Sequence, residues 1–267
     1  MKKIVTGLCF LGFISSAEMA FAAGEIVKDN SFLIEEAYNQ EAGVVQFIFG
    51  HQYLQPSHNT TTTFTNELPV GGESHQFSYV IPMQKIGATS ESGLGDVSLN
   101  YRYQLVNNEH VAMAPRVSLL LPTGDSKKDL GTGAVGLQFN QSLSITLNDR
   151  WSNHWNAGFT YTPQAQDAAG DKSDVFGFNF GTSVIYNWSP RTNLLCELVT
   201  NTLEKTTGPG TKASESSYYI LPGIRTAFDV GETEVVPGIG ALFGLGPSAV
   251  DHELGVFAYL SFESKLW

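Results

Sequence analysis

The chain has 267 residues, with 15 Lys and Arg against 26 Asp and Glu, which gives a formal net charge of -11. This charge repels phosphate backbones, so nucleic acid is not expected as a partner. Only 15% of the residues are charged, whereas ordinary soluble domains have ~25%. Aromatic residues reach 12% and glycines number 27. This composition favours an all-β protein in an unusual solvent.

The first 22 residues have the pattern of a secretory signal peptide. Lys2 and Lys3 provide the positive start, Ile4 to Ile14 form an apolar run, and Ala20-Phe21-Ala22 offers a cleavage site between small residues. An uncleaved helical anchor is the alternative, but the run is short for a membrane helix, which needs ~18 apolar residues. Cleavage would leave Cys196 as the one thiol, so neither a disulfide nor a cysteine metal site is expected.

The rest of the chain is a series of segments in which apolar and polar residues alternate, the period of a half-buried β-strand. Between Asp96 and Leu105 the apolar or aromatic positions are Val97, Leu99, Tyr101, Tyr103 and Leu105. Such runs predict strands near 43–54, 59–69, 73–84, 95–106, 110–122, 133–146, 152–163, 174–188, 192–203, 216–230, 234–244 and 252–266. An even number of strands returns both termini to one side, as a bacterial outer-membrane barrel requires.

The connections between these runs alternate in character. One set is short and turn-like, for example 69–72, 148–150 and 231–233. The other set is mostly longer and polar, for example Thr123–Thr132, Gln164–Ser173 and Glu204–Glu215. Barrels of this class have short periplasmic turns and longer external loops. All four tryptophans fall near the short-turn end, where a girdle at the membrane interface is expected: Trp151, Trp155, Trp188 and Trp267.

The sequence therefore predicts a twelve-stranded antiparallel transmembrane outer-membrane β-barrel. Its expected parts are a signal peptide (1–22), a periplasmic N-terminal segment (23–42) and the barrel (43–267), with both termini in the periplasm. The alternative is a secreted β-sandwich, whose strands are shorter and whose outer faces are polar. In the barrel, outer-membrane lipid is the expected partner of the apolar face, and Cys196 is expected to contact it.

Three motifs carry a resemblance to a known family. They are Phe32–Gln40 before the first strand, Ser92–Val97 at the fourth strand, and Leu121–Asp125 at the end of the fifth. Together they resemble the phenol-degradation meta-pathway transporter-like family of outer-membrane proteins. The resemblance implies an outer-membrane transporter, in some members linked to uptake of aromatic or hydrophobic compounds, and it supplies no catalytic residues. The terminal Trp267 resembles a signal for the barrel-assembly machinery, although it is out of phase with Val256 to Phe262.

The lumen face is expected to carry charge. Alternation directs six charged side chains inward: Arg102, Arg116, Glu197, Arg225, Glu263 and Lys265. Arg102 and Arg116 should lie close together across a hairpin, and Glu197 should form a salt bridge with Arg225. We predict a selective constriction made by Arg102, Arg116, Glu197 and Arg225. The alternative is a charge network that only fills and rigidifies a narrow barrel.

A plug is a second expectation for the lumen, because twelve strands leave a bore between the filled and the open sizes. The segment 24–41 has a short helical pattern. We expect it to enter the lumen from the periplasm and to set Glu35 and Glu36 against Arg102 and Arg116. The alternative is a flexible periplasmic tail.

Enzymatic chemistry is not expected. Gly131–Gly136 matches the dinucleotide pattern, but a strand follows it where a helix would be needed. The histidines at 51, 58, 75, 110, 154 and 252 have no metal-ligand spacing. His75 and Ser78, the nearest candidates for a lipid hydrolase, point to opposite faces of a strand. No catalytic residue, metal or cofactor is therefore predicted.

The predicted function is a passive narrow channel or transporter for small molecules, hydrophobic or aromatic ones among them. Two alternatives stay open. One is a lipid-modifying hydrolase, which would depend on a residue such as Ser78. The other is a structural or adhesive barrel that works through its external loops.

Overall fold

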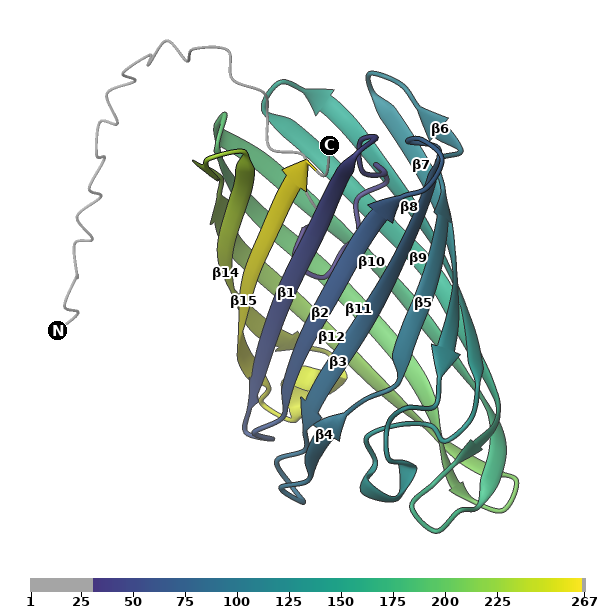
Figure 1. Cartoon of the computed structure of the whole chain (residues 1–267). Helices are drawn as coiled ribbons and strands as arrows, with labels where there is room; N and C mark the ends of the chain where they lie inside the picture. The colour runs from purple at the N-terminus through teal and green to yellow at the C-terminus, as the bar shows by residue number, and fades with distance from the viewer. Residues whose placement is uncertain (1–30, 266–267) are drawn as a thin grey trace, which may run out of the picture.

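The computed structural model describes residues 31–265 and is a closed antiparallel β-barrel of twelve long strands (Figure 1). The long strands are β1 (Val44–Gln55), β2 (Thr60–Pro69), β3 (His75–Lys85), β5 (Val97–Tyr103), β7 (Val111–Leu121), β8 (Gly136–Asn148), β9 (Trp151–Gln166), β10 (Lys172–Ser189), β11 (Thr192–Gly208), β12 (Thr211–Thr226), β14 (Thr233–Leu245) and β15 (Leu254–Lys265). Pairing of β1 with β15 closes the barrel. The predicted fold class is confirmed.

Short elements complete the described chain: the strands β4 (Ser92–Leu94), β6 (Val106–Asn107) and β13 (Phe228–Val230), the 3-10 helix η1 (Ser126–Lys128) and the helix α1 (Pro247–Val250). Over residues 31–265, no helix is long and apolar enough to cross a membrane.

The alternating sequence explains the two faces of the wall. On β10, Phe176, Phe178 and Phe180 point outward and are exposed, while Ser183 on the inward phase is fully buried. Cys196 is exposed on the outer face of β11, as predicted. The outer face therefore carries large apolar side chains, which is the requirement for contact with lipid.

The strands differ in length from the prediction at one end of the barrel. The expected loops at 164–173 and 204–215 are largely hairpins, because β9 to β12 extend to Gln166, Lys172, Gly208 and Thr211. Figure 1 shows these hairpins projecting beyond the other strands. Cross-strand ion pairs hold the extension, with Lys212 Nζ 2.6 Å from Glu204 and Lys205 Nζ 3.0 Å from Glu215. The sequence of these extensions lacks apolar alternation, because strands that project beyond the lipid need no lipid-facing side chains.

Two predicted strands are interrupted. The segment 95–106 is divided among β5, β6 and the residues around them, and Gly95 and Asp96 stand outside the ladder. The segment 216–230 breaks at Ala227, whose N–H donates to the carbonyl of Arg191 at 2.8 Å. Between β5 and β6, likewise, the N–H of Gln104 donates to the carbonyl of Ser74 in a turn, at 2.8 Å.

Asp96 closes a clasp between two of the sequence motifs. Its carboxylate accepts from the N–H of Gly124 at 3.0 Å, and from the N–H and the hydroxyl of Thr132 at 2.7 Å each. Gly124 and Gly131 lie so close that a Cβ on Gly131 would sit 2.7 Å from the Cα of Gly124. The motifs 92–97 and 121–125 therefore fold the loop 122–135 over the end of β5.

Asp96→Ala is expected to release this loop. The change removes three hydrogen bonds to a charged acceptor, each contributing about 1.5–3 kcal/mol. Limited proteolysis should then cut within 124–133 at least tenfold faster than in the wild type. Asp125→Ala is the matched control, because Asp125 is exposed and caps only η1. Equal cutting of the two variants would contradict the clasp.

Three of the four tryptophans lie as predicted near the short turns. Trp151 begins β9 and Trp188 stands one residue before the end of β10, and both are exposed. Trp151 packs on Tyr186 with ring centroids 4.8 Å apart. Trp155 is exposed on the same outer face. Trp267 lies outside the described residues. The aromatic group is placed where a membrane interface would be.

Candidate functional site

The lumen is occupied by residues 31–43, which run inside the barrel before β1 begins (Figure 1). Ser31 and Ala37 are fully buried, and Phe32 and Ile34 are nearly so. The helix expected within 24–41 is absent from its described part, 31–41, and residues 24–30 lie outside the described chain. The reason is that many N–H groups of the segment bond to wall side chains and not to each other. We call residues 31–41 the lumen segment.

Glu197 anchors the start of the lumen segment. Its Oε1 accepts from the N–H of Phe32 at 2.7 Å and its Oε2 from the N–H of Leu33 at 2.9 Å, with Ile34 at 3.4 Å. Glu197 is fully buried on β11. A buried carboxylate is tolerated when hydrogen-bond donors surround it, and here the donors are main-chain groups.

The predicted salt bridge between Glu197 and Arg225 is not formed in the described chain. The register places Arg225 opposite Asn193, four positions before Glu197 on β11. Arg225 Nε donates to Asn193 Oδ1 at 2.9 Å. The prediction was wrong because it placed the two residues at equal depth. Arg225 and Glu197 both face the lumen, and the larger cavity reaches Arg225.

Arg102 and Arg116 are direct cross-strand partners on β5 and β7, and both point inward. Arg116 holds the carboxylate of Glu35 with two hydrogen bonds, of 2.7 and 3.1 Å. Arg102 donates to the carbonyls of Glu36 and Tyr38. Glu67 lies 3.7 Å from Arg102. The lumen segment and the wall thus supply the negative charge and the acceptors that two adjacent guanidinium groups require.

Arg116→Ala is expected to weaken the hold on the lumen segment, because a two-pronged, partly buried guanidinium–carboxylate pair is lost. Glu35→Gln by itself should have a similar effect. The double variant should release the segment no faster than the more damaging of the two single variants. The release of the segment can be followed as protease cutting between Phe32 and Glu41. We expect a coupling of about 1–2 kcal/mol between the two sites. Additive effects would show that Arg116 and Glu35 act independently.

Neutral wall side chains hold the middle and end of the lumen segment. Asn156 accepts from the N–H of Glu35 at 2.9 Å and donates to its carbonyl at 2.8 Å. Gln104 does the same for the N–H of Asn39 and the carbonyl of Ala37. Ser144 and Gln76 accept from Ala37 and Gln40. Sequence reasoning missed these residues, although most of them lie on the inward phase of predicted strands.

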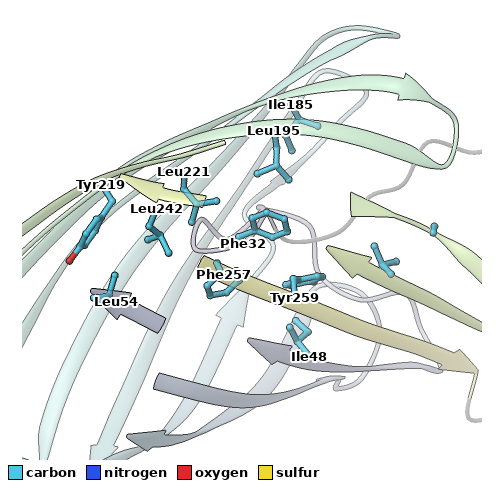
Figure 2. Packing of buried hydrophobic residues seen from close by; sticks show 12 residues of the cluster. Phe32, Ile48, Leu54, Ile185, Leu195, Tyr219, Leu221, Leu242, Phe257 and Tyr259 are labelled. Atoms are coloured by element: carbon cyan, nitrogen blue, oxygen red, sulfur yellow. The ribbon is translucent and has the colours of Figure 1, made fainter. Parts of the chain in front are cut away.

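An apolar patch of the wall receives Phe32 (Figure 2). Its ring lies 5.5 Å from the ring of Phe257 and 5.7 Å from that of Tyr259, centroid to centroid. Three inward glycines make room for it: Gly223, Gly238 and Gly240. A Cβ on Gly223 or Gly238 would come within 2.3 or 2.6 Å of the Phe32 ring. We call these glycines with Phe257 and Tyr259 the Phe32 cradle.

The candidates for hydrolytic chemistry do not form a catalytic pair. His75 bonds to Tyr101 Oη on the outer face, whereas Ser78 Oγ accepts from Asn100 inside. A different pair, Ser144 and His154, does face the lumen at 2.7 Å, but Ser144 Oγ also receives the N–H of Ala37. Within the described residues, no three His, Cys, Asp or Glu side chains gather as a metal site.

Cavities lie against both halves of the lumen segment. The larger, of about 890 Å³, contacts residues 36 and 38–41 and opens at the end of the short turns. It is strongly acidic, with Arg225 and Lys265 as its Lys and Arg lining residues, against Glu36, Glu41, Glu73, Glu109, Asp229, Glu232, Glu234 and Glu263. The smaller, of about 190 Å³, contacts Leu33 and Ile34 and is lined by neutral residues, including Asn156, Asn179 and Tyr219.

Solved structures that share this fold include an outer membrane channel and a porin. The COG4313 outer membrane channel from Pseudomonas putida F1 matches with a TM-score of 0.61 and 12% identity, over 85% of this chain and 97% of that one. The NanC porin matches with a TM-score of 0.55 and 10% identity, over 81% of this chain and 98% of that one. At such identity the likeness shows the fold alone. No curated protein matches this chain in sequence.

A family model covers residues 72–228, which is more than half of the chain and runs from β3 to β13. The matched part includes the Asp96 clasp, Arg102, Arg116, Glu197 and Arg225. The protein therefore belongs to the family described as protein of unknown function, DUF3187.

Proposed function

We propose that this protein is a passive outer-membrane channel for small molecules and that the lumen segment closes its bore. The segment stands between two cavities, and wall side chains hold it. That arrangement carries the proposal, because the segment can leave without breaking the barrel ladder. In this proposal both termini are periplasmic, and the acidic cavity is the periplasmic vestibule.

Arg102, Arg116, Glu197 and Arg225 form the constriction in this proposal. Arg102, Arg116 and Glu197 contact the lumen segment directly. Arg225 borders the vestibule. When the segment moves, the two arginines and Glu197 would be exposed on different sides of the bore. A passing solute would then meet both signs of charge, together with the apolar Phe32 cradle.

The proposed solutes are neutral and include aromatic or hydrophobic compounds. The resemblance to the phenol-degradation meta-pathway transporter-like family supports that class, as does a lumen with an apolar patch beside polar side chains. The carboxylates of the vestibule disfavour anions by repulsion. The similar folds belong to a channel and a porin, which favours a role other than catalysis.

A reversible crosslink tests the gating directly. The hydroxyls of Ser31 and Ser183 are 2.8 Å apart, so cysteines at both positions are close enough for a disulfide. In a Cys196→Ser background, oxidised Ser31→Cys/Ser183→Cys protein should admit a small neutral solute that lipid excludes, such as a sugar, into proteoliposomes at least tenfold more slowly than the reduced form. Reduction should restore the flux.

The control is the Ser183→Cys single variant, which has no partner thiol and should not respond to oxidation. Equal flux through the oxidised and reduced double variant would contradict gating by the lumen segment. If neither form conducts while deletion of external loops abolishes binding to a surface, the barrel would be adhesive and not a channel.

A further inference from the structure

The wall of the lumen binds main-chain atoms along nearly the whole lumen segment. Six side chains from five strands and one neighbouring turn reach the backbone of residues 32–40: Glu197, Asn156, Arg102, Ser144, Gln104 and Gln76. Asn156 and Gln104 each pair with both an N–H and a carbonyl. These contacts use groups that every peptide has, so they do not depend on the side chains of the occupant.

Two of the side chains that bind the segment are charged and deeply buried. Glu197 is 0% and Arg102 is 3% exposed. A charged group so deeply buried needs partners. Main-chain N–H groups supply them for Glu197, and two carbonyls supply part of them for Arg102. When the segment leaves, these side chains lose those partners, and an extended peptide is a ligand that can replace both kinds of contact.

Two further contacts select side chains. The Phe32 cradle fits an aromatic ring, because its glycines leave the space that the ring fills. Arg116 binds the carboxylate of Glu35, three positions later. An occupant with an aromatic residue three positions before an acidic one matches both contacts.

We infer that the lumen is a binding site for extended peptides with an aromatic residue three positions before an acidic residue, and that the lumen segment is its resident ligand. A free peptide of this class binds in its place. The inference rests on the proposed displacement of the segment, but it does not require that the barrel conduct.

The test keeps the full chain and cuts it after folding. A recognition sequence for a specific protease is inserted between Glu41 and Ala42, which are both exposed. After cleavage, a fluorescent peptide of residues 31–41 is added and its anisotropy is followed. We expect saturable binding at one peptide per barrel. A serine peptide that keeps only Phe and Glu at the two selected positions should compete within tenfold of the native peptide.

The matched control is the native peptide with Phe32 and Glu35 exchanged, which has the same composition and backbone. It should compete at least tenfold more weakly. Glu197→Gln in the wall should weaken binding tenfold or more, whereas Glu204→Gln on the same strand should not. Retention of the cut segment through gel filtration would also support the inference, since the segment is then a tightly bound peptide.

Loss of the cut segment without binding of the labelled peptide would overturn the inference, as would equal competition by the exchanged peptide. The proposed channel has a separate readout. If the Ser31–Ser183 crosslink stops flux but no peptide binds, the channel stands and the peptide site falls. If the peptide binds but the crosslink leaves flux unchanged, the peptide site stands and gating by the lumen segment falls.

Discussion

Glu197→Gln is expected to raise the open probability of the barrel in a planar bilayer at least tenfold. The carboxylate accepts main-chain N–H groups of Phe32 and Leu33 through different oxygens. Glutamine has one carbonyl oxygen, and its amide NH₂ would face the other donor. Hydrogen bonds to a charged group contribute about 1.5–3 kcal/mol each. Loss of one of them is enough for the tenfold shift, which corresponds to about 1.4 kcal/mol.

Glu204→Gln is the matched control for this change. Glu204 lies on the same strand, but its partners are Lys212 and the N–H of Phe176, outside the lumen segment. The control should keep the wild-type conductance, and both variants should keep the β-sheet signal in circular dichroism. If Glu197→Gln is as silent as the wild type, the anchor is not what keeps the bore closed.

Much of the fold could be predicted from the sequence because lipid imposes a strict alternation. On β10 every second residue from Phe176 to Phe180 is aromatic, and the observed outer face follows it. The rule fails where no lipid is in contact. The extensions of β11 and β12 beyond Glu204 are polar on both faces, so their strands were predicted as loops.

The lumen was harder to predict for a physical reason. Alternation states which side chains point inward, and Arg102 and Arg116 follow from that rule. It does not fix the depth of a residue across a hairpin, so Glu197 was paired with Arg225 in error. It also gives no weight to neutral residues. Asn156 and Gln104 each bond to both an N–H and a carbonyl of the lumen segment, and the glycines of the Phe32 cradle act by the absence of a side chain.

Gly238→Ala is expected to expel Phe32 from its cradle and to open the bore. The new Cβ would lie 2.6 Å from Cε1 of Phe32, and 3.1 Å from the Cβ of Arg225 on the neighbouring strand. No carbon pair tolerates the first distance, so the ring has to move. In a strand that has room for it, alanine is better than glycine by roughly 0.5–1 kcal/mol. A loss of hold on the segment would therefore come from the cradle and not from the strand.

Adding Phe32→Ala to Gly238→Ala distinguishes a clash with the Phe32 ring from an effect on the strand itself. Removal of the ring abolishes the clash. Gly238→Ala should therefore reduce the free energy that holds the lumen segment by at least about 1 kcal/mol less in the Phe32→Ala background than in the wild type. The quantity to measure is the rate of protease cutting within the lumen segment, with conductance as a second readout. Phe32→Ala alone should also loosen the segment, since burial of a Phe side chain contributes about 1.5–3 kcal/mol. Strict additivity of the two changes would mean that Gly238 acts on the barrel wall itself, and the Phe32 cradle would lose its role in closing the bore.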